Sequence, residues 1–233
     1  MLDKINQIQQ QIEDAKQKSP NPTADITLIA VSKTYPIEAI EEAYANGIKD
    51  FGENKVQELT TKIAQTDLDI NWHFIGHLQT NKVKYIVDKV VLIHSVDSIK
   101  LIDEIEKQAF KKNIVCQILL EINIANEESK FGFDINEVDK ILEYIKQLRH
   151  VQVRGLMCVA PNVADKEENR KLFQIIYKKF VDIQIQNLDN VYMDILSVGM
   201  SNDFTVAVEE GSNCVRIGTA IFGNRQYAKR MER

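Results

Sequence analysis

Apolar and polar positions follow two different periods along the chain. Near the start, apolar residues recur every three or four positions, at Leu2, Ile5, Ile8 and Ile12. This spacing is typical of one face of an amphipathic helix. We therefore expect residues 1–19 to form an N-terminal helix that ends before the proline-containing loop at 20–22.

From residue 26 onward, short apolar runs alternate with stretches of helical period. Eight runs are predicted as strands: ITLIAVSK, IKDFGE, INWHFIGH, VVLIHSV, IVCQILLEINI, VRGLMCVA, VYMDILSVG and NCVRIGTAIFG. Each is followed by a predicted helix, and the length of 233 residues is close to the ~250 residues typical of a (β/α)8 barrel. Several runs are almost continuously apolar, as expected for parallel strands covered on both faces. The alternative is a doubly wound open sheet, but no GxGxxG follows the first strand.

We therefore predict an α/β fold consisting of a single (β/α)8 TIM-type barrel, with the N-terminal helix as an addition. Residues 1–233 are expected to form one domain, with the helix of residues 1–19 packed on the barrel. Single residues also predict where some helices begin and end. Pro36 is expected at the start of the second helix and Gly47 at its end, Asp134 is an expected N-cap, and QTNKVKYIVDK is expected to be helical.

Composition and charge narrow the class of protein. The formal net charge is -5, so the chain lacks the basic surface typical of nucleic-acid-binding proteins. No apolar run approaches the ~20 residues that span a bilayer, and the polar N-terminus lacks the apolar core of a signal peptide. Cys116, Cys158 and Cys214 are dispersed among apolar residues, which argues against a disulfide framework or a zinc site. A cytoplasmic protein without membrane or nucleic-acid partners is expected.

Candidate chemistry begins at Lys33, which ends the first predicted strand. Ile29, Val31 and Lys33 share one face of that strand because side chains alternate. If this face lines the barrel, Lys33 points into the mouth where barrel active sites lie. Partial burial favours the neutral, nucleophilic amine. Lys33 is therefore a candidate for Schiff-base formation; the alternative is an ordinary solvated lysine.

The last two strands lead through small and hydroxyl residues into short predicted helices. Ser201 follows one strand, and Gly218 and Thr219 follow the other. Barrels often bind phosphate at these two loops, where free main-chain N–H groups and the helix dipole favour a dianion. The alternative is ordinary helix capping by Ser201 and Thr219.

A carbonyl-reactive lysine beside a phosphate site points to pyridoxal 5'-phosphate (PLP). Arg216 lies two residues before Gly218. If its guanidinium meets the pyridine nitrogen, it offers a proton donor but no negative charge, so the nitrogen stays unprotonated. That arrangement would restrict carbanion chemistry. The alternative is an arginine whose stem packs in the barrel and whose charge is paired.

The motifs, taken together, resemble a known family. AVSKTYP, FGENKVQE, WHFIGHLQTNK, HSVDS, SKFGF, RGLMCVAP, LSVGMSNDF and VRIGTAIFG occur in the order seen in the PLP homeostasis proteins, the YggS-like family. These are single-domain relatives of the alanine racemase barrel, among the fold-type III PLP proteins. The resemblance extends from about the first strand to the last helix.

The resemblance implies roles for individual residues. Lys33 would carry the internal aldimine, and the phosphate would be held by Met200 with Ser201 and by Gly218 with Thr219. Arg216 would face the pyridine nitrogen and Asn54 would lie near the ring. No role follows for Gln79, Asn81, Lys82 or His77. Two interpretations of Lys130 stay open: a solvated charge, or a second amine that reacts with PLP. For His73, His94 and His150 we expect structural roles rather than metal ligation.

Two functions remain open at this point. By resemblance, the chain is a non-enzymatic protein that buffers PLP and passes it to apo-enzymes, and a monomer is expected. The alternative is a PLP-dependent amino-acid racemase. Alanine racemases, however, carry a second β domain and a tyrosine base donated across a dimer, and here only Tyr227 occurs after the barrel. No robust catalysis is therefore expected.

Overall fold

The fold is a closed barrel of parallel strands surrounded by helices, as the sequence predicts. The computed structural model describes residues 1–125, 127 and 130–223. Each strand pairs with its sequence neighbours, and the first pairs with the eighth to close the barrel. The strands are β1 (Thr27–Val31), β2 (Asp50–Glu53), β3 (Asn71–Phe74), β4 (Leu92–Val96), β5 (Cys116–Ile122), β6 (Val151–Cys158), β7 (Val191–Met200) and β8 (Cys214–Ile217). Tyr227 lies outside the described residues.

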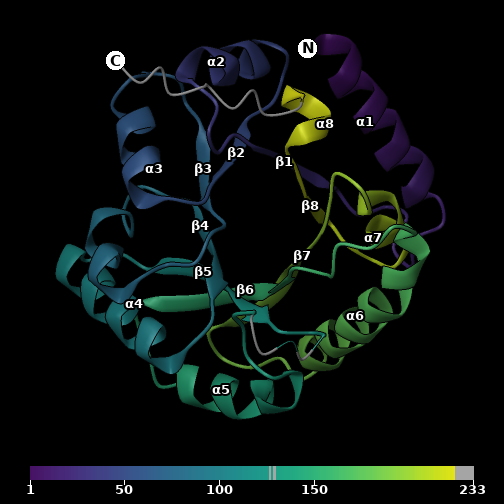
Figure 1. Cartoon of the computed structure of the whole chain (residues 1–233). Helices are drawn as coiled ribbons and strands as arrows, with labels where there is room; N and C mark the ends of the chain where they lie inside the picture. Colours follow the sequence, from purple (N-terminus) through teal and green to yellow (C-terminus); the bar gives the residue numbers. More distant parts are fainter. Residues whose placement is uncertain (126, 128–129, 224–233) are drawn as a thin grey trace.

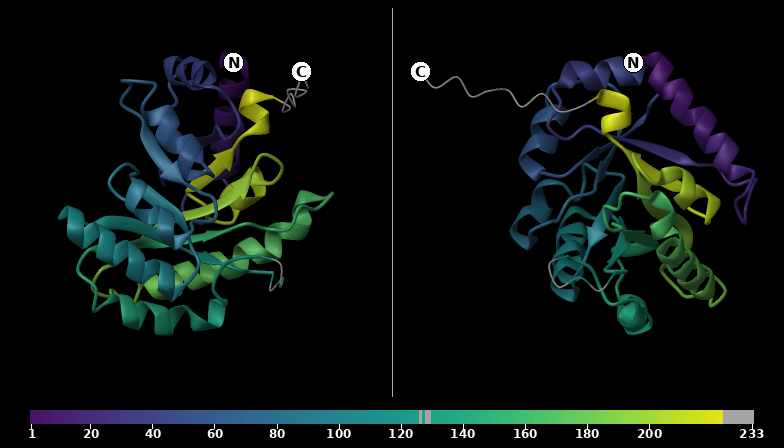
Figure 2. Two further views of the ribbon diagram at one scale, coloured as in Figure 1. Left: turned by 60° about the vertical axis from the view of Figure 1, so that its left-hand side comes forward. Right: turned by 45° about the vertical axis from the view of Figure 1, so that its right-hand side comes forward.

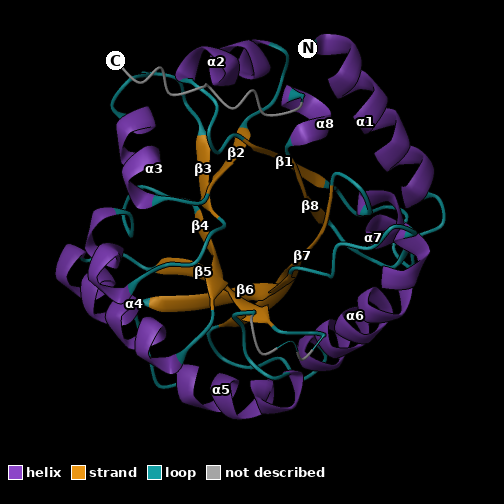
Figure 3. Ribbon diagram, in the orientation of Figure 1, coloured by secondary structure: helices purple, strands orange, loops and turns teal. Residues whose placement is uncertain are grey.

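Helices form an outer ring around the strands (Figure 1, Figure 3). The α-helices are α1 (Leu2–Lys16), α2 (Ile37–Ala45), α3 (Val56–Ile63), α4 (Ile99–Lys112), α5 (Val138–Ile145), α6 (Arg170–Gln184), α7 (Phe204–Glu209) and α8 (Thr219–Phe222). Short 3₁₀ helices occur at η1 (Thr80–Tyr85), η2 (Ile135–Glu137) and η3 (Lys166–Asn169). Among the described residues, none of the helices is long and apolar enough to cross a membrane.

The expected boundaries are mostly confirmed. Pro36 is the N-cap of α2, and Gly47 follows its C-cap with φ of 93°. Asp134 caps η2, where its side chain accepts a hydrogen bond from the main-chain N–H of Asn136 at 2.8 Å. The helix expected over QTNKVKYIVDK is a 3₁₀ helix and covers only residues 80–85.

The N-terminal helix packs on the outside of the barrel. Ile5, Ile8, Ile12 and Ala15 of α1 are buried, as their spacing predicts. They contact α7 and α8, the two short helices that follow β7 and β8 (Figure 1, Figure 2). α1 therefore supports the part of the barrel from which the last two strand-end loops emerge.

Apolar side chains fill the space between strands and helices, and also part of the barrel interior. A small cluster of Leu92, Leu119 and Met157 is separate from the main core. On the other side of the barrel, a Cβ on Gly52 would lie 2.9 Å from Ile75 and 3.0 Å from Ile29, so these strand residues crowd one another. The interior is thus packed, and the open space lies at the C-terminal ends of the strands.

Candidate functional site

A cavity of about 770 Å³ opens at the C-terminal ends of the strands. Its volume lies in the range of small-molecule sites, ~300–1,000 Å³. It is lined by residues of β1, β7 and β8 and of the segments that follow β1, β2, β3, β6, β7 and β8. All the residues predicted for the site line this cavity: Lys33, Asn54, Met200, Ser201, Arg216, Gly218 and Thr219.

Lys33 lies in a sharp turn just after β1. The next residue, Thr34, has φ of 72°, a conformation that a β-branched residue rarely adopts. Its main-chain N–H donates to Oε1 of Glu58 at 2.5 Å, and the N–H of Tyr35 donates to the carbonyl of Ser32 at 3.0 Å. The backbone that carries Lys33 is therefore held on both sides.

A buried cluster of charged side chains from β2 and α3 supports this turn. The ammonium group of Lys62 donates to Glu53 and Glu58, each at 2.7 Å, and to the carbonyl of Ser32 at 2.8 Å. The hydroxyl of Ser32 donates to Glu53 at 2.6 Å. Burial raises the pKa of Glu53, although Lys62 and Ser32 oppose the shift. The cluster ties α3 and the end of β2 to the main chain next to Lys33.

Arg216 reaches the cavity from β8, the neighbour of β1 in the closed sheet. It is buried, and burial lowers the pKa of its guanidinium. Nη1 donates to the carbonyl and hydroxyl oxygens of Ser197 at 2.6 and 2.5 Å, and Nη2 donates to the carbonyl of Cys158 at 2.8 Å. Strands β6 and β7 thus hold the guanidinium group in place.

The loops after β7 and β8 lie against each other. The main-chain N–H of Gly218 donates to Oγ of Ser201 at 3.2 Å. A Cβ at Gly218 would lie 3.3 Å from the carbonyl oxygen of Val31, so the glycine allows β8 to end close to the strand that carries Lys33. In α8 the first intrahelical bond runs from Ile221 to Gly218 at 3.0 Å. The N–H groups of Thr219 and Ala220 precede that bond at the helix N-terminus.

Two residues that the sequence analysis missed brace these loops. Asp203 accepts a hydrogen bond from the N–H of Met200 at 2.7 Å and another from the side chain of Asn169 at 2.9 Å. Asn169 also donates to the carbonyl of Pro161 at 3.0 Å. The position of Asp203 directly before a predicted helix was a signal for capping. Nothing in the sequence pairs it with Asn169.

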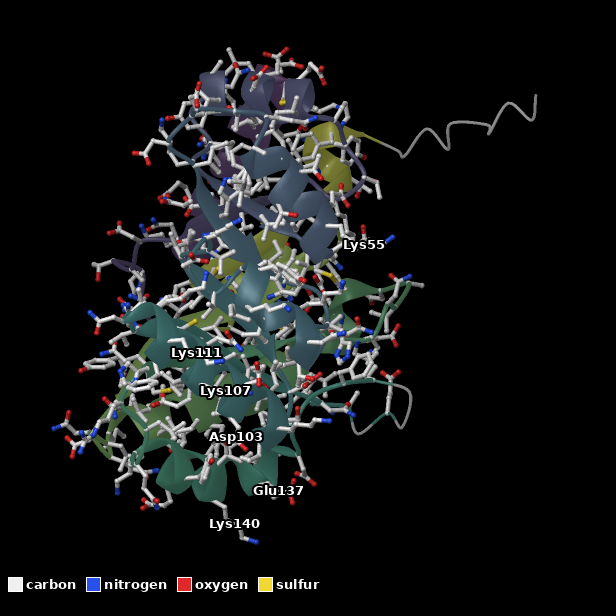
Figure 4. The ribbon with its side chains drawn as sticks, turned by 90° about the vertical axis from the view of Figure 1, so that its left-hand side faces the viewer. Lys55, Asp103, Lys107, Lys111, Glu137 and Lys140 are labelled. Atoms are coloured by element: carbon white, nitrogen blue, oxygen red, sulfur yellow. The ribbon has the colours of Figure 1, made fainter. Side chains whose placement is uncertain are left out.

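Asn54 supplies an unsatisfied acceptor in the cavity wall. Its side-chain oxygen Oδ1 is buried and has no hydrogen-bond partner. A Cβ at Gly76 would lie 2.4 Å from the carbonyl oxygen of Asn54, so the neighbouring strand approaches closely and fixes this residue. Its neighbour Lys55 in the GENK motif points outward instead (Figure 4). A buried acceptor without a partner is costly, so Asn54 carries an unpaired polar atom beside the cavity.

Glu121 on β5 is a titratable group that the sequence analysis missed. Burial, and secondarily the charge of Asp97, raise the pKa of Glu121 to about 7, while Arg216 opposes the shift. Glu121 lines a second cavity of about 200 Å³ with Lys130, and Val159 lines both cavities. Its only sequence signal was a single acid within an apolar strand.

The other motif residues do not line the main cavity. Gln79, Asn81 and Lys82 lie in or beside η1, and Lys130 forms an ion pair with Glu127 at 2.7 Å. His77 contacts Asp97 at 2.8 Å and stacks on Phe131. His73 and His94 are hydrogen-bonded to each other, and His150 is hydrogen-bonded to Glu106. Within the described residues, no three His, Cys, Asp or Glu side chains are grouped to hold a metal ion.

Comparisons with known proteins give a consistent result. Residues 4–226 match the family model "Alanine racemase, N-terminal domain". The pyridoxal phosphate homeostasis protein of Aquifex aeolicus is 44% identical over 226 residues, which cover 97% of this chain and 98% of that protein.

Solved structures are similar over nearly the whole chain. PipY of Synechococcus elongatus without PLP is 35% identical with a TM-score of 0.85, covering 96% of this chain and 100% of that one. The structure of PipY with PLP bound is 36% identical with a TM-score of 0.79, and the match covers 91% of this chain and 100% of that one. Alanine racemase from Corynebacterium glutamicum is 14% identical with a TM-score of 0.67, covers 94% and 60%, and shares the fold alone.

Proposed function

The chain belongs to the family of pyridoxal phosphate homeostasis proteins, and on that premise we propose that it holds PLP covalently on Lys33 and supplies it to apo-enzymes. The observation that carries the proposal is one cavity that is lined both by Lys33, just after β1, and by the loops after β7 and after β8, the neighbour of β1. PipY, the relative whose structure contains PLP, supports the choice of ligand.

The residues present fit this cofactor. When bound, PLP supplies an aldehyde that condenses with a primary amine, a phosphate dianion and a ring with donor and acceptor groups. Ser201 and Thr219 offer hydroxyl groups to the phosphate, and the N-terminus of α8 offers main-chain N–H groups. Met200 and Gly218 complete the two loops. Arg216 would offer a donor to the ring nitrogen, and Asn54 would lie near the ring.

The proposal extends to a carrier without robust catalysis. Arg216 offers the ring nitrogen a hydrogen bond but no negative charge, which weakens the electron sink. The names of the relatives agree with a homeostatic role. We further propose one domain that acts as a monomer in the cytoplasm, where the three buried free thiols would stay reduced.

One observation favours the alternative of a PLP-dependent racemase-type enzyme. Racemisation needs a second proton-transferring group besides Lys33. Glu121 has a pKa of about 7 and lines a cavity that adjoins the main one, so it has the tuned pKa that such a group requires. A measurement of amino-acid turnover is needed to decide between the carrier and the racemase-type enzyme.

The first experiment tests where PLP is bound. Protein incubated with PLP should acquire visible absorbance, borohydride should make the attachment permanent, and peptide mapping should find it on Lys33. Lys33→Ala should lose the absorbance. Lys166→Ala is the matched control, because Lys166 also lines the cavity and its loss should leave the absorbance unchanged. Absorbance retained in Lys33→Ala would assign another amine.

The second experiment separates carrier from enzyme. PLP-loaded protein should restore activity to a PLP-dependent apo-enzyme, and should racemise or decarboxylate single L-amino acids negligibly. Sustained turnover at ordinary enzymatic rates, ~1 per second or more, would overturn the carrier proposal. Loss of that turnover in Glu121→Gln would then identify the second group.

A further inference from the structure

A continuous hydrogen-bonded chain crosses the interior of the barrel and ends at Arg216. Oδ1 of Asp50 lies 3.0 Å from Nε2 of His73, and Nδ1 of His73 lies 3.0 Å from Nε2 of His94. Nδ1 of His94 lies 3.0 Å from Oγ of Ser197, which lies 2.5 Å from Nη1 of Arg216. We call these five residues the relay. Its members come from β2, β3, β4, β7 and β8.

The relay runs between the two faces of the barrel. Asp50 is the first residue of β2, so it lies at the N-terminal end of the strands and is partly exposed. Arg216 lines the cavity at the other end. The members between them are buried, and His94 and Ser197 are fully enclosed. Such a polar row in a barrel interior costs desolvation unless every donor and acceptor is matched.

Neutral imidazole rings give the relay one consistent set of hydrogen-bond directions. A guanidinium group only donates, and an ionised carboxylate only accepts. His73 therefore donates from Nε2 to Asp50 and accepts at Nδ1 from Nε2 of His94. His94 then accepts at Nδ1 from the hydroxyl of Ser197, which accepts from Arg216. In this arrangement, assigned from the network, both neutral rings carry the proton on Nε2.

The electrostatics of His94 agree with that assignment. Its pKa is lowered well below the usual value, first by burial and then by the charges of His73 and Arg216. A protonated His94 would no longer accept the hydroxyl hydrogen of Ser197 and would add a buried positive charge near the guanidinium group of Arg216. The neutral tautomer is thus the one that satisfies all three groups.

The relay limits the orientation of Arg216. The guanidinium group has five N–H donors, and three of them are engaged by oxygen atoms of Ser197 and Cys158. The hydroxyl of Ser197 accepts from Arg216 with a lone pair and donates its own hydrogen to His94, so His94 restricts the rotation of this hydroxyl group. Rotation of the guanidinium group would break several of these bonds together, so the remaining donors keep a constant direction.

We propose that Ser197 and His94 are positioning residues, which through the relay hold Arg216 as a fixed hydrogen-bond donor toward the ring nitrogen of PLP. The inference rests on the proposed function for the identity of the ligand. The relay itself is a property of the protein without ligand. Ser197 and His94 act through Arg216 and touch neither the aldehyde nor the phosphate site.

The test uses the whole protein and two readouts. Ser197→Ala removes the donor to His94 and one acceptor of Arg216. In ligand-free protein with ¹⁵N-labelled histidine, NMR should show His94 as a single Nε2–H tautomer in the wild type and a tautomer mixture in Ser197→Ala. After loading with PLP, the variant's visible band should shift, become pH-dependent, and show about two- to tenfold weaker PLP retention, as expected for one lost hydrogen bond.

Ser212→Ala is the matched control. Ser212 is a buried serine beside the same two strands, and its hydroxyl contacts the carbonyls of Leu196, Val198 and Cys214 at 3.1, 2.8 and 3.2 Å. The Ser212→Ala variant should be less stable than the wild type, yet keep the wild-type histidine NMR signals and the wild-type visible absorbance band. A second pair is His94→Asn and His94→Leu. Only asparagine keeps an acceptor at the position of Nδ1, so it should restore the band that leucine loses.

The outcomes separate this inference from the proposed function. Wild-type histidine signals and an unchanged band in Ser197→Ala would overturn the positioning role, as would equal effects of Ser197→Ala and Ser212→Ala. If Ser197→Ala fails to fold, the His94 pair decides, and indistinguishable asparagine and leucine variants reject the role. If the wild type gains no band with PLP, the proposed function fails, while the NMR result still reports on the relay.

Discussion

Lys33 and Arg216 differ in how their surroundings hold them. Lys33 lies on a turn whose backbone is braced by Glu58 and Lys62, so its main chain is held in place. Arg216 is held at the guanidinium group itself by Ser197 and Cys158. The two residues that the proposed function assigns to the aldehyde and to the ring nitrogen are therefore supported at different points, one at its main chain and the other at its charged group.

At Glu121 we expect a pH-dependent effect on stability. The folded protein raises the pKa of this carboxyl to about 7, so folding favours its neutral form. The stability contributed by the neutral form is complete below the unfolded pKa and is lost as pH rises through 7. Glu121→Gln should therefore match the wild type near pH 4.5 and be more stable at pH 8, by about 2 kcal/mol after allowing for its partial exposure.

Urea denaturation at the two pH values measures this difference. Glu127→Gln is the control, because that glutamate forms a partly exposed ion pair with Lys130 and its replacement should give no such gain at pH 8. An equal change at both pH values would show that folding does not shift the pKa of Glu121.

Ser201 and Thr219 should each contribute to retention of the phosphate group. Ser201→Ala and Thr219→Val each remove a hydroxyl donor to an anion, worth roughly 1.5–3 kcal/mol, or about ten- to a hundredfold in affinity. Equilibrium dialysis of PLP measures the loss. Thr205→Val, on α7 outside the cavity lining, should retain PLP as the wild type does. Wild-type retention in the Ser201 and Thr219 double variant would move the phosphate elsewhere.

The site residues that could be predicted from sequence are those that mark strand ends. Lys33, Ser201, Gly218 and Thr219 follow apolar runs directly, so the barrel geometry brings them together. Their supporting partners could not be predicted. His94 and Ser197, for example, are far apart in the sequence, and their contact exists only because β4 and β7 face each other across the closed barrel.

Among the elements, β6 and β7 show how an irregular pairing depends on one glycine. Their register shifts between Val153 and Gly155. A Cβ on Gly155 would lie 1.7 Å from the carbonyl oxygen of Ile195, and its φ is 152°. The irregularity lies upstream of Cys158 and Ser197, whose carbonyl groups hold Arg216. A disturbance here would therefore reach the cavity.

Gly155→Ala should destabilise the protein severely, by about 3 kcal/mol or more, because the added methyl group meets main-chain atoms that cannot move aside. Gly47→Ala is the control. Gly47 also has positive φ, 93°, but a Cβ there has no neighbour within 4 Å, so only the backbone strain of about 1–2 kcal/mol applies. Thermal or urea denaturation compares the two, and equal losses would contradict the steric argument.

The segment after β3 shows that a periodic pattern does not determine the type of helix. QTNKVKYIVDK has helical spacing of apolar residues, yet residues 80–85 wind as a 3₁₀ helix. Val83, Ile86 and Val87 are buried as that spacing requires. The pattern therefore identified the inward face correctly. The tighter winding depends on how the segment fits between β3 and β4, which periodicity does not encode.

At the scale of the whole molecule, α1 connects the start of the chain to the two short helices that follow β7 and β8. It packs against α7 and α8, and Lys18 just after it pairs with Glu209 of α7 at 2.9 Å. Together with the surrounding helices it completes the outer layer (Figure 2). The support of the cavity therefore extends to side chains that lie far outside it.

Ile8→Ala should cost about 2–4 kcal/mol of stability by creating a cavity between α1 and the barrel, and should speed amide hydrogen exchange in residues 200–222. Leu2→Ala is the control, because Leu2 is 50% exposed and its truncation should change stability by less than about 0.5 kcal/mol. Unchanged exchange in residues 200–222 of Ile8→Ala would show that α1 does not support the loops.

The pairing of β1 with β8 has a consequence for the newly made chain on the ribosome. About 185 residues separate Lys33 from Gly218, so at ~5–20 residues per second their synthesis is roughly 10–40 s apart. During that interval Lys33 has neither the loops after β7 and β8 nor Arg216 beside it. Under the proposed function, a nascent chain would therefore offer PLP only one more ordinary lysine, and selective capture would begin only when translation has delivered the last strand.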